Sequence, residues 1–248
     1  MKNNMQNIFD NEIFFDGYSK IHQRKDNANE LFVKPALFSM MPPLDGKTVI
    51  DLGCGFGELC MEYIRRGAES VFGIDISEKM LAVAKSENSH PKITYRLMSM
   101  EEISCLKEKF DVVTSSLALH YVEDYQTVVH NVHELLNDGG VFVFSQIHPM
   151  NTSFSSGDRW TRDENGRKLF ANIANYGIEK EWESTWIIDH VKKYHRTFST
   201  IVNTLIDNGF TIEKIVEPIP TADFLQKHPE YDDLLHKPDF LLVKARKG

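Results

Sequence analysis

Two hydrophobic patterns alternate along most of the chain. Short runs rich in Val, Ile and Phe are followed by segments in which apolar residues recur every third or fourth position, which are the periods of strands and helices. Strands that alternate with helices are typical of crossover units in a mainly parallel sheet. The patterns predict strands at 48–52, 70–74, 93–97, 110–115, 141–145, 210–216 and 239–245, and helices at 58–66, 77–86, 197–208 and 221–236.

The alternation is interrupted between residues 148 and 196. This segment holds all three tryptophans and the turn sequence Glu164-Asn165-Gly166, which lies between runs that suggest short antiparallel strands. Regular elements resume at Thr197, so we predict a flap inserted into a single domain of residues 1–248. The predicted parts are an N-terminal helical lid at 1–44, a core at 45–147, the flap at 148–196 and the rest of the sheet at 197–248.

Composition narrows the class of protein. The chain has 248 residues, of which 42% are hydrophobic, and can therefore bury the core of one large domain. A net charge of −8 disfavours non-specific binding to nucleic acid, because that binding needs clustered positive charge. The three cysteines lack the spacing of a disulfide framework, and no apolar run is long enough to cross a bilayer. We therefore expect a cytoplasmic protein with no membrane or nucleic-acid partner.

The strongest local signal is the sequence Asp51-Leu52-Gly53-Cys54-Gly55-Phe56-Gly57-Glu58, which joins a predicted strand to a predicted helix. Glycines let the backbone approach a ligand closely, and free N–H groups at a helix start favour a negative group. The dinucleotide pattern G-x-G-x-x-G requires glycine where Glu58 stands, which disfavours a nicotinamide-dependent oxidoreductase. Asp75 ends the next strand, where a carboxylate can accept hydrogen bonds from the ribose hydroxyls of an adenosine.

These residues resemble the class I S-adenosylmethionine-dependent methyltransferases. Residues 49–59 resemble the first motif of that family, Asp75 its ribose-binding acid, 110–121 its fourth-strand motif and 135–140 its turn into the fifth strand. The resemblance covers about residues 45–150. It implies an α/β fold: a Rossmann-like, doubly wound sheet of seven mostly parallel strands with an antiparallel last strand, and here a small flap after the fifth.

A narrower resemblance extends beyond the core. The sequences at 145–149, 193–197 and 217–220 are similar to those of a bacterial subgroup of methyltransferases, of the type 11-like kind, that act on small molecules. This similarity implies a small-molecule acceptor. The acidic balance, and the lack of an Asn/Asp-Pro-Pro-aromatic motif after the fourth strand, disfavour a nucleic-acid methyltransferase.

The family resemblance implies a site for S-adenosylmethionine, with S-adenosylhomocysteine as the product. Asp51 would lie near the ammonium group of the cofactor, and the backbone of Gly53 and Gly55 would face its methionine portion. Asp75 would bind the ribose, and Ile76 would pack on the adenine. The other residues that the resemblance assigns to the cofactor site are Tyr18, Arg24, Cys54, Gly57, Ser99, Met100, Ser116 and Leu117.

Candidate catalytic residues follow the fourth strand. His120 and Tyr121 are placed at the edge where open α/β sheets bind ligands. His120 could remove the proton of the acceptor, or it could be a structural histidine packed in the turn. The same two interpretations apply to His148 and to His195, which is the third catalytic candidate. We expect no metal site.

Aromatic residues of the flap could roof an acceptor pocket, or they could form the small core that keeps the flap folded. The predicted substrate-binding residues are His148, Trp160, Tyr176, Trp186 and Tyr194. The basic run at 192–196 could bind an anionic acceptor or could be a solvated strand end.

The sequence therefore predicts an S-adenosylmethionine-dependent methyltransferase, monomeric or homodimeric, that transfers the sulfonium methyl to a small molecule by in-line displacement. A non-catalytic sensor or partner subunit that binds the same cofactor would keep every motif and is the alternative.

Overall fold

The structure is a computed structural model that describes residues 7–153 and 157–248. Its strands are β1 (Thr48–Leu52), β2 (Ser70–Asp75), β3 (Ile93–Leu97), β4 (Phe110–Ser116), β5 (Leu136–Ile147), β6 (Trp160–Arg162), β7 (Lys168–Ala171), β8 (Lys180–Trp186), β9 (Ile188–His195), β10 (Phe210–Val216) and β11 (Phe240–Lys247). Its α-helices are α1 (Glu12–His22), α2 (Lys34–Met40), α3 (Glu58–Arg65), α4 (Glu78–Glu87), α5 (Tyr125–Leu135), α6 (Pro149–Thr152), α7 (Phe198–Asp207) and α8 (Ala222–Lys227). Shorter helical segments are η1 (Ile8–Asp10), η2 (Asn29–Val33), η3 (Met100–Cys105), η4 (Leu119–Tyr121) and η5 (Pro229–Leu235).

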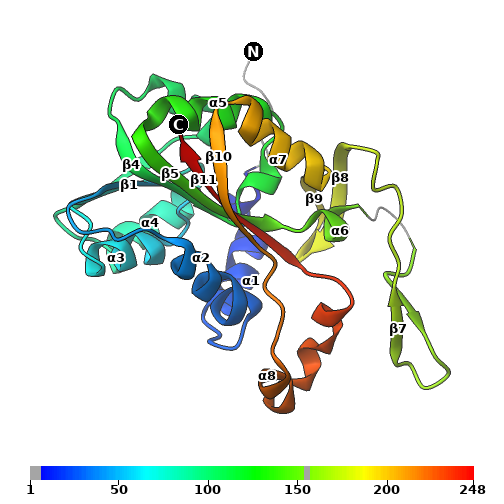
Figure 1. Ribbon diagram of the computed structural model, residues 1–248. Helices are drawn as coiled ribbons and strands as arrows, with labels where there is room; N and C mark the ends of the chain where they lie inside the picture. The colour runs from blue at the N-terminus through cyan, green and yellow to red at the C-terminus, as the bar shows by residue number, and fades with distance from the viewer. Residues whose placement is uncertain (1–6, 154–156) are drawn as a thin grey trace.

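A seven-stranded sheet in the described part of the chain has the order β10-β11-β5-β4-β1-β2-β3 (Figure 1). β11 is antiparallel to both of its neighbours, and the other pairs are parallel. The predicted mostly parallel sheet with an antiparallel last strand is confirmed. The strand order reverses between β1 and β4, so the carboxyl ends of β1, β2 and β4 meet at one edge, where open α/β sheets bind ligands.

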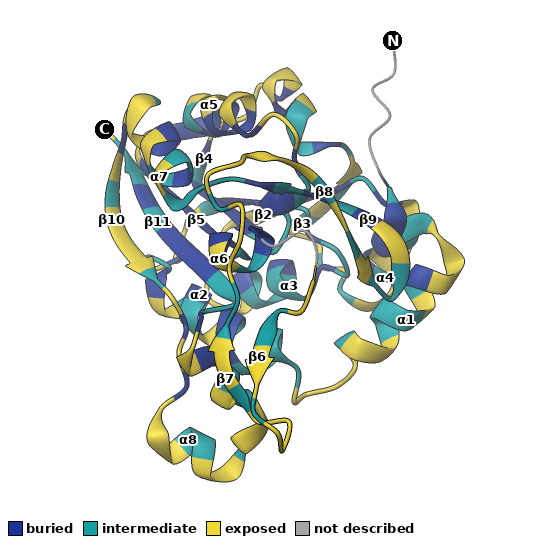
Figure 2. Ribbon diagram, turned by 90° about the vertical axis from the view of Figure 1, so that its right-hand side faces the viewer, coloured by how far each residue is buried: buried dark blue, intermediate teal, exposed yellow. Residues whose placement is uncertain are grey.

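Helices cover both faces of the sheet. α5 and α7 lie on one face, and α2, α3 and α4 lie on the other (Figure 1). Residues of β1 alternate between the two cores: Ile50 and Leu52 pack toward α5, and Val49 packs toward α3. Figure 2 shows β5 and β11 mainly in the colour of buried residues, whereas the edge strand β10 is largely exposed. The inner strands are therefore apolar on both faces, as a doubly wound fold requires.

Helix boundaries follow local chemistry. Ser77 caps α4, because its side chain accepts a hydrogen bond from the Met80 N–H. The predicted single helix at 221–236 is wrong: α8 ends before His228, and η5 begins at Pro229. A proline lacks the N–H that continues a helix and displaces the preceding residue from helical geometry. His228 accordingly has φ −134° and ψ 62°.

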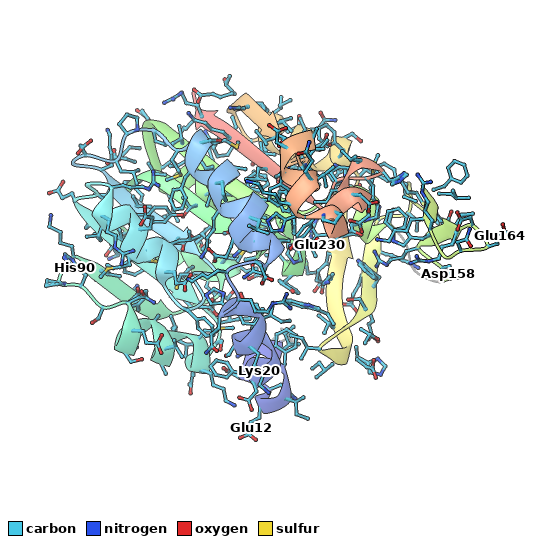
Figure 3. The ribbon with its side chains drawn as sticks, turned by 90° about the horizontal axis from the view of Figure 1, so that it is seen from below. Glu12, Lys20, His90, Asp158, Glu164 and Glu230 are labelled. Carbon is cyan, nitrogen blue, oxygen red and sulfur yellow. The ribbon has the colours of Figure 1, made fainter. Side chains whose placement is uncertain are left out.

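The flap after β5 contains two separate two-stranded sheets, β6–β7 and β8–β9. The β6–β7 hairpin projects away from the main sheet, and Glu164 at its turn lies at the outer edge of the molecule (Figure 3). The β8–β9 hairpin instead packs on the segment after β4 and on α1, where Val191 joins a small core with Phe14 and Tyr121. Across residues 7–153 and 157–248, no helix combines the length and apolar character needed to span a membrane.

Candidate active site

Three glycines turn the chain from β1 into α3. Gly53, Gly55 and Gly57 have φ values of 74°, 53° and 77°, in the left-handed region that favours glycine. A Cβ at Gly53 would lie 2.6 Å from the Ala118 Cβ, and one at Gly57 would lie 2.3 Å from the Tyr95 hydroxyl. A Cβ at Gly55 would meet no atom within 4 Å. Two of the glycines are thus required by packing within the protein, whereas Gly55 is open to a ligand.

Asp75 ends β2 beside this loop and is 9% exposed. One carboxylate oxygen accepts a hydrogen bond from the Gly55 N–H (2.8 Å), and the other accepts one from the Ser77 N–H (2.9 Å). Burial raises the pKa of Asp75, and these hydrogen bonds oppose the rise. Each oxygen has a lone pair left for a further donor. The side chain can therefore accept hydrogen bonds from two neighbouring hydroxyl groups of a ligand.

The end of β4 is held in an unusual backbone conformation. Leu117 has a φ of 54°, and its N–H donates to the carbonyl oxygen (2.9 Å) and the Oγ (3.1 Å) of Ser145. Ser116 Oγ lies 3.2 Å from the same Ser145 Oγ. A non-glycine residue in this region is strained and persists where its surroundings enforce it, often at functional sites. The turn leads directly into η4, which carries His120 and Tyr121.

The N-terminal helices close the site from the other side. Tyr18 of α1 packs edge-on against Phe9 and Trp186, with ring centroids 5.5 and 6.0 Å apart. Burial, together with the charges of Asp75 and Glu58, raises the pKa of Tyr18 to about 12. This phenol therefore stays neutral at physiological pH and can donate a hydrogen bond.

Glu58 ties these helices to the glycine loop. His22 Nε2 lies 3.1 Å from Glu58 Oε1, and Lys34 Nζ lies 2.6 Å from Oε2. The contacts with His22 and Lys34 lower the pKa of Glu58 to about 2. The residue that departs from the dinucleotide pattern is therefore an anchor for the N-terminal segment.

These elements enclose one cavity of about 440 Å³, within the range of small-molecule sites. At one end its walls include Gly53, Gly55, Asp75, Ile76, Met98 and Met100, and at the other His120, Tyr121, Trp186 and Lys193. Ser116 and Leu117 lie on the wall as well. The cavity thus joins the loop of β1 to the flap without a break.

Comparison with known proteins identifies the family. A family model described as a methyltransferase domain matches residues 50–144. An uncharacterized protein of Haemophilus influenzae is 37% identical over 251 residues, which cover 99% of this chain and 98% of that protein. The crystal structure of an S-adenosylmethionine-dependent methyltransferase from Mesorhizobium loti is 39% identical with a TM-score of 0.80, covering 90% of this chain and 99% of that one.

The chain belongs to the class I S-adenosylmethionine-dependent methyltransferases. Its cofactor is S-adenosylmethionine. A shorter match joins this methyltransferase to the ubiquinone biosynthesis O-methyltransferase of Coxiella burnetii, with 36% identity over 107 residues. That match covers 42% of this chain and 45% of the Coxiella protein.

The residues at the loop end of the cavity fit this cofactor. Gly55 leaves room for close approach, Asp75 offers paired acceptors for ribose hydroxyls, and Ile76 supplies apolar surface for the adenine. Asn29 also lies on the cavity wall, and its Oδ1 is buried with no hydrogen-bond partner among the described residues. Such an acceptor suits the ammonium group of the cofactor.

Asp51 lies beneath the loop and is not part of the cavity wall. Its Oδ1 accepts a hydrogen bond from the Thr114 hydroxyl (2.7 Å), and its Oδ2 accepts one from the Cys60 thiol (3.7 Å). Burial raises the pKa of Asp51 to about 6. The structure therefore places the predicted ammonium partner one layer below the site, where its charge is costly to the cofactor-free protein.

This burial predicts a pH-dependent stability. Because the folded pKa of about 6 exceeds the ordinary aspartate pKa of 3.8, the folded state holds the proton more tightly, and the associated stability is lost as pH rises through about 6. The Asp51→Asn variant has no carboxyl group to ionise at this position, so it should not lose this stability as pH rises. In urea unfolding of the cofactor-free protein, the variant should gain up to roughly 3 kcal/mol relative to wild type between pH 4 and pH 7. If the folding stability of both proteins changed with pH in the same way, the raised pKa of Asp51 would be contradicted.

Several predicted cofactor residues lie outside the cavity wall. Arg24 is exposed and pairs with Asp26 (Nε to Oδ1, 3.0 Å), so we revise its assignment to a surface ion pair. Ser99 is buried as the cap of η3, because its Oγ accepts a hydrogen bond from the Glu101 N–H. Cys54 is buried, and its pKa is raised well above the usual value by a hydrogen bond with Cys60 and by burial. Gly57 serves the packing described above. The cofactor residues that do lie on the wall are Tyr18, Gly53, Gly55, Asp75, Ile76, Met100, Ser116 and Leu117.

The predicted histidines separate into two groups. His120 lies on the cavity wall and is buried, whereas His148 and His195 lie outside it. His195 contacts the Thr152 hydroxyl through Nδ1 (2.7 Å) and the Tyr176 carbonyl through Nε2 (2.9 Å). His148 caps α6 through Nδ1, and its Nε2 lies 2.8 Å from Glu217 Oε1. Since both ring nitrogens of each are occupied by the protein, we reassign His148 and His195 to holding the flap in place.

Of the predicted flap aromatics, only Trp186 is on the cavity wall. Trp160 packs under Lys168 and Lys237, and the Tyr176 hydroxyl accepts a hydrogen bond from the Phe198 N–H. Tyr194 lies on the outer face of β9 and donates to Glu181 (3.1 Å). These three side chains therefore stabilise the flap, which corrects their assignment to the substrate pocket.

Many residues on the cavity wall were not among the predicted site residues, and His22, Lys193 and Asn29 are three of them. His22 lies four residues after Tyr18, on the same face of α1, so helical spacing could have found it. Lys193 belongs to the basic run, and the strand period places it on the same side as the apolar Val191. Asn29 has no comparable local signal, because its position depends on how η2 packs.

Proposed function

We propose that this methyltransferase transfers the methyl group to a small-molecule acceptor by in-line displacement. The single observation that carries the proposal is the cavity of about 440 Å³ whose wall includes both Asp75 and Trp186. The lid helices and the β8–β9 hairpin form its walls, which leaves a compartment suited to a small molecule and not to a broad polymer surface. A monomeric or homodimeric, cytoplasmic enzyme remains part of this proposal.

When bound, S-adenosylmethionine supplies an electrophilic methyl group on a sulfonium. The chain then has to align the acceptor and exclude water. Tyr18, Tyr121 and Trp186 provide apolar walls for both tasks. Burial raises the pKa of Tyr121, so it too stays a neutral hydroxyl.

His120 is suited to orienting the acceptor. Burial, with the charges of Lys193 and Arg196, holds the pKa of His120 well below its usual value, so the ring is neutral. Its Nδ1 accepts a long hydrogen bond from the Ile147 N–H (3.5 Å), which places the proton on Nε2. In this tautomer His120 donates a hydrogen bond to an acceptor atom, which differs from the predicted role as a base.

The experiment that tests this function uses labelled methyl groups. Purified enzyme and methyl-labelled S-adenosylmethionine are incubated with the metabolite, protein and RNA fractions of a cell extract. We expect label in the metabolite fraction alone, and none when Asp75→Ala replaces the wild type. Label that enters only protein or RNA would refute the small-molecule proposal.

A further inference from the structure

Lys193 is a buried lysine on the acceptor side of the cavity. It is 8% exposed, lies on β9 and forms part of the cavity wall. Its Nζ lies 5.5 Å from the centre of the Trp186 ring and 5.8 Å from that of Trp182. The two indoles give a favourable cation–π setting, which is weaker than pairing with an anion.

The fold provides no carboxylate for this ammonium group. Within residues 7–153 and 157–248, no Asp or Glu oxygen lies within 4.0 Å of Lys193 Nζ. The remaining stretches, 1–6 and 154–156, contain no Asp or Glu. Lys192, on the opposite face of the strand, pairs with Glu181 at 3.0 Å. Of these two neighbouring lysines, the one without a carboxylate partner is therefore Lys193, which faces the cavity.

Lys237 is buried to the same degree as Lys193 but has polar partners for its ammonium group. Lys237 is 7% exposed, and its Nζ donates to Asp239 Oδ1 (2.7 Å) and Asn151 Oδ1 (2.8 Å). Buried charges in proteins are paired or bind a ligand, because removing a charge from water is strongly unfavourable. Lys193 departs from this rule within the same molecule.

The charges around Lys193 are mainly positive. Burial, followed by the charge of Arg159, lowers the pKa of Lys193 to about 8, so the ammonium form still dominates at pH 7. The acids on the cavity wall have other partners: Asp239 binds Lys237, and Asp75 accepts the loop N–H groups. Glu101 lies with Met100 near the cofactor end. Among the residues that the structure describes, no acid of the cavity wall therefore pairs with Lys193.

We propose that the acceptor carries an anionic group, a carboxylate or a phosphate, and that Lys193 binds it. This inference rests on the proposed small-molecule function and names the class of acceptor. The aromatic wall formed by Tyr121 and Trp186 suits an apolar body attached to the anion. Pairing with an ammonium lowers the nucleophilicity of the anion, so we assign it to anchoring the acceptor, while a different atom receives the methyl group.

The first test compares two lysine variants without any acceptor. Lys193→Met removes a buried charge that has no carboxylate partner among the described residues, so the cofactor-free variant should unfold about 2–4 °C higher than wild type. Lys237→Met is the matched control: it breaks an existing pair and should unfold at a lower temperature. If Lys193→Met lowers the unfolding temperature as Lys237→Met does, Lys193 is structural and the proposal is overturned.

The second test uses anionic probes on enzyme saturated with S-adenosylhomocysteine. The probes are inorganic phosphate, benzoate and phenylacetate, and benzamide and phenylacetamide are the neutral controls. We expect at least one anion, and neither amide, to raise the unfolding temperature of the wild type. Lys193→Met should abolish this response, and Lys193→Arg should keep part of it because the charge remains. Phosphate and carboxylate responses separate the two anion chemistries.

The outcomes distinguish this inference from its alternatives. Lys193→Met should bind S-adenosylhomocysteine within about twofold of wild type by calorimetry, since Lys193 lies on β9, whereas Gly55 and Asp75 lie at the ends of β1 and β2. A larger loss would show that Lys193 binds the carboxylate of the cofactor, which overturns the proposal. The proposal is also overturned if the amides raise the unfolding temperature as much as the acids do. It is overturned as well if no anion raises the unfolding temperature of the wild type more than that of Lys193→Met. Methylation of a neutral metabolite would leave the proposed function standing and refute this inference alone.

Discussion

Replacing Asp75 with alanine is expected to weaken binding of S-adenosylmethionine by roughly 30- to 1000-fold, which corresponds to about 2–4 kcal/mol. In the site we propose for the cofactor, this carboxylate at the end of β2 is the charged acceptor for the ribose hydroxyls. Its two oxygens already position the loop through Gly55 and Ser77, so the loss combines missing ligand contacts with a looser loop. Calorimetric titration with S-adenosylmethionine and S-adenosylhomocysteine measures the effect.

The control for this variant has to disturb the same helix start without touching the cavity. Asp10 meets that need, because it accepts hydrogen bonds from the Ser77 hydroxyl (2.6 Å) and the Lys79 N–H (3.1 Å) and lies off the cavity wall. Asp10→Ala should change cofactor affinity far less than Asp75→Ala. Asp75→Asn, which keeps the size and loses the charge, should fall between them. An Asp75→Ala affinity within about threefold of wild type would refute the ribose assignment.

Gly55→Ala is expected to reduce cofactor affinity by roughly 5- to 150-fold, because the new methyl group occupies space that the ligand needs (about 1–3 kcal/mol of overpacking). The backbone at this position has a φ of 53° and nothing within 4 Å of the added Cβ, so the folded protein itself has room for it. The cost to unfolding stability should be about 1–2 kcal/mol, the usual penalty for a non-glycine residue in this conformation.

Gly46 supplies a matched control for that penalty. Its φ is 68°, an added Cβ also meets nothing within 4 Å, and it lies in the turn before β1, off the cavity wall. Gly46→Ala and Gly55→Ala should therefore lose similar stability in urea unfolding, whereas only Gly55→Ala should lose cofactor affinity in calorimetry. Equal affinities in the two variants would mean that the open side of Gly55 does not face the cofactor.

Many of the residues predicted for the cofactor lie together on the cavity wall, because they are local in sequence. The loop follows a buried strand directly, and Asp75 ends the next one, so strand period and glycine spacing were sufficient. Arg24 lies off the cavity wall for a local reason as well. Helix α1 ends at His22, and residues beyond the end of a helix no longer continue its face. His22, one turn after Tyr18, was the better choice.

The acceptor end depends on contacts between distant segments, which a single sequence does not show. The sequence left His195 as either a catalytic or a structural histidine, and its partners Thr152 and Tyr176 come from elsewhere in the flap. His148 is engaged by Glu217, which is 69 residues away in the chain. The strand period places Lys193 on the same side as Val191, but the packing of β9 on η4 is needed to show that this side faces the cavity.

The cavity is built from two parts of the chain, one inside the methyltransferase family match and one in the flap after β5. The family model matches residues 50–144, which contain the glycine loop and Asp75, whereas Trp186 and Lys193 belong to the β8–β9 hairpin outside that match. Substitutions in the β8–β9 hairpin can reshape one end of the cavity without altering the backbone that holds the cofactor. If the acceptor binds as we propose, exchange of this hairpin should change the compound that is methylated while the methyl donor stays the same.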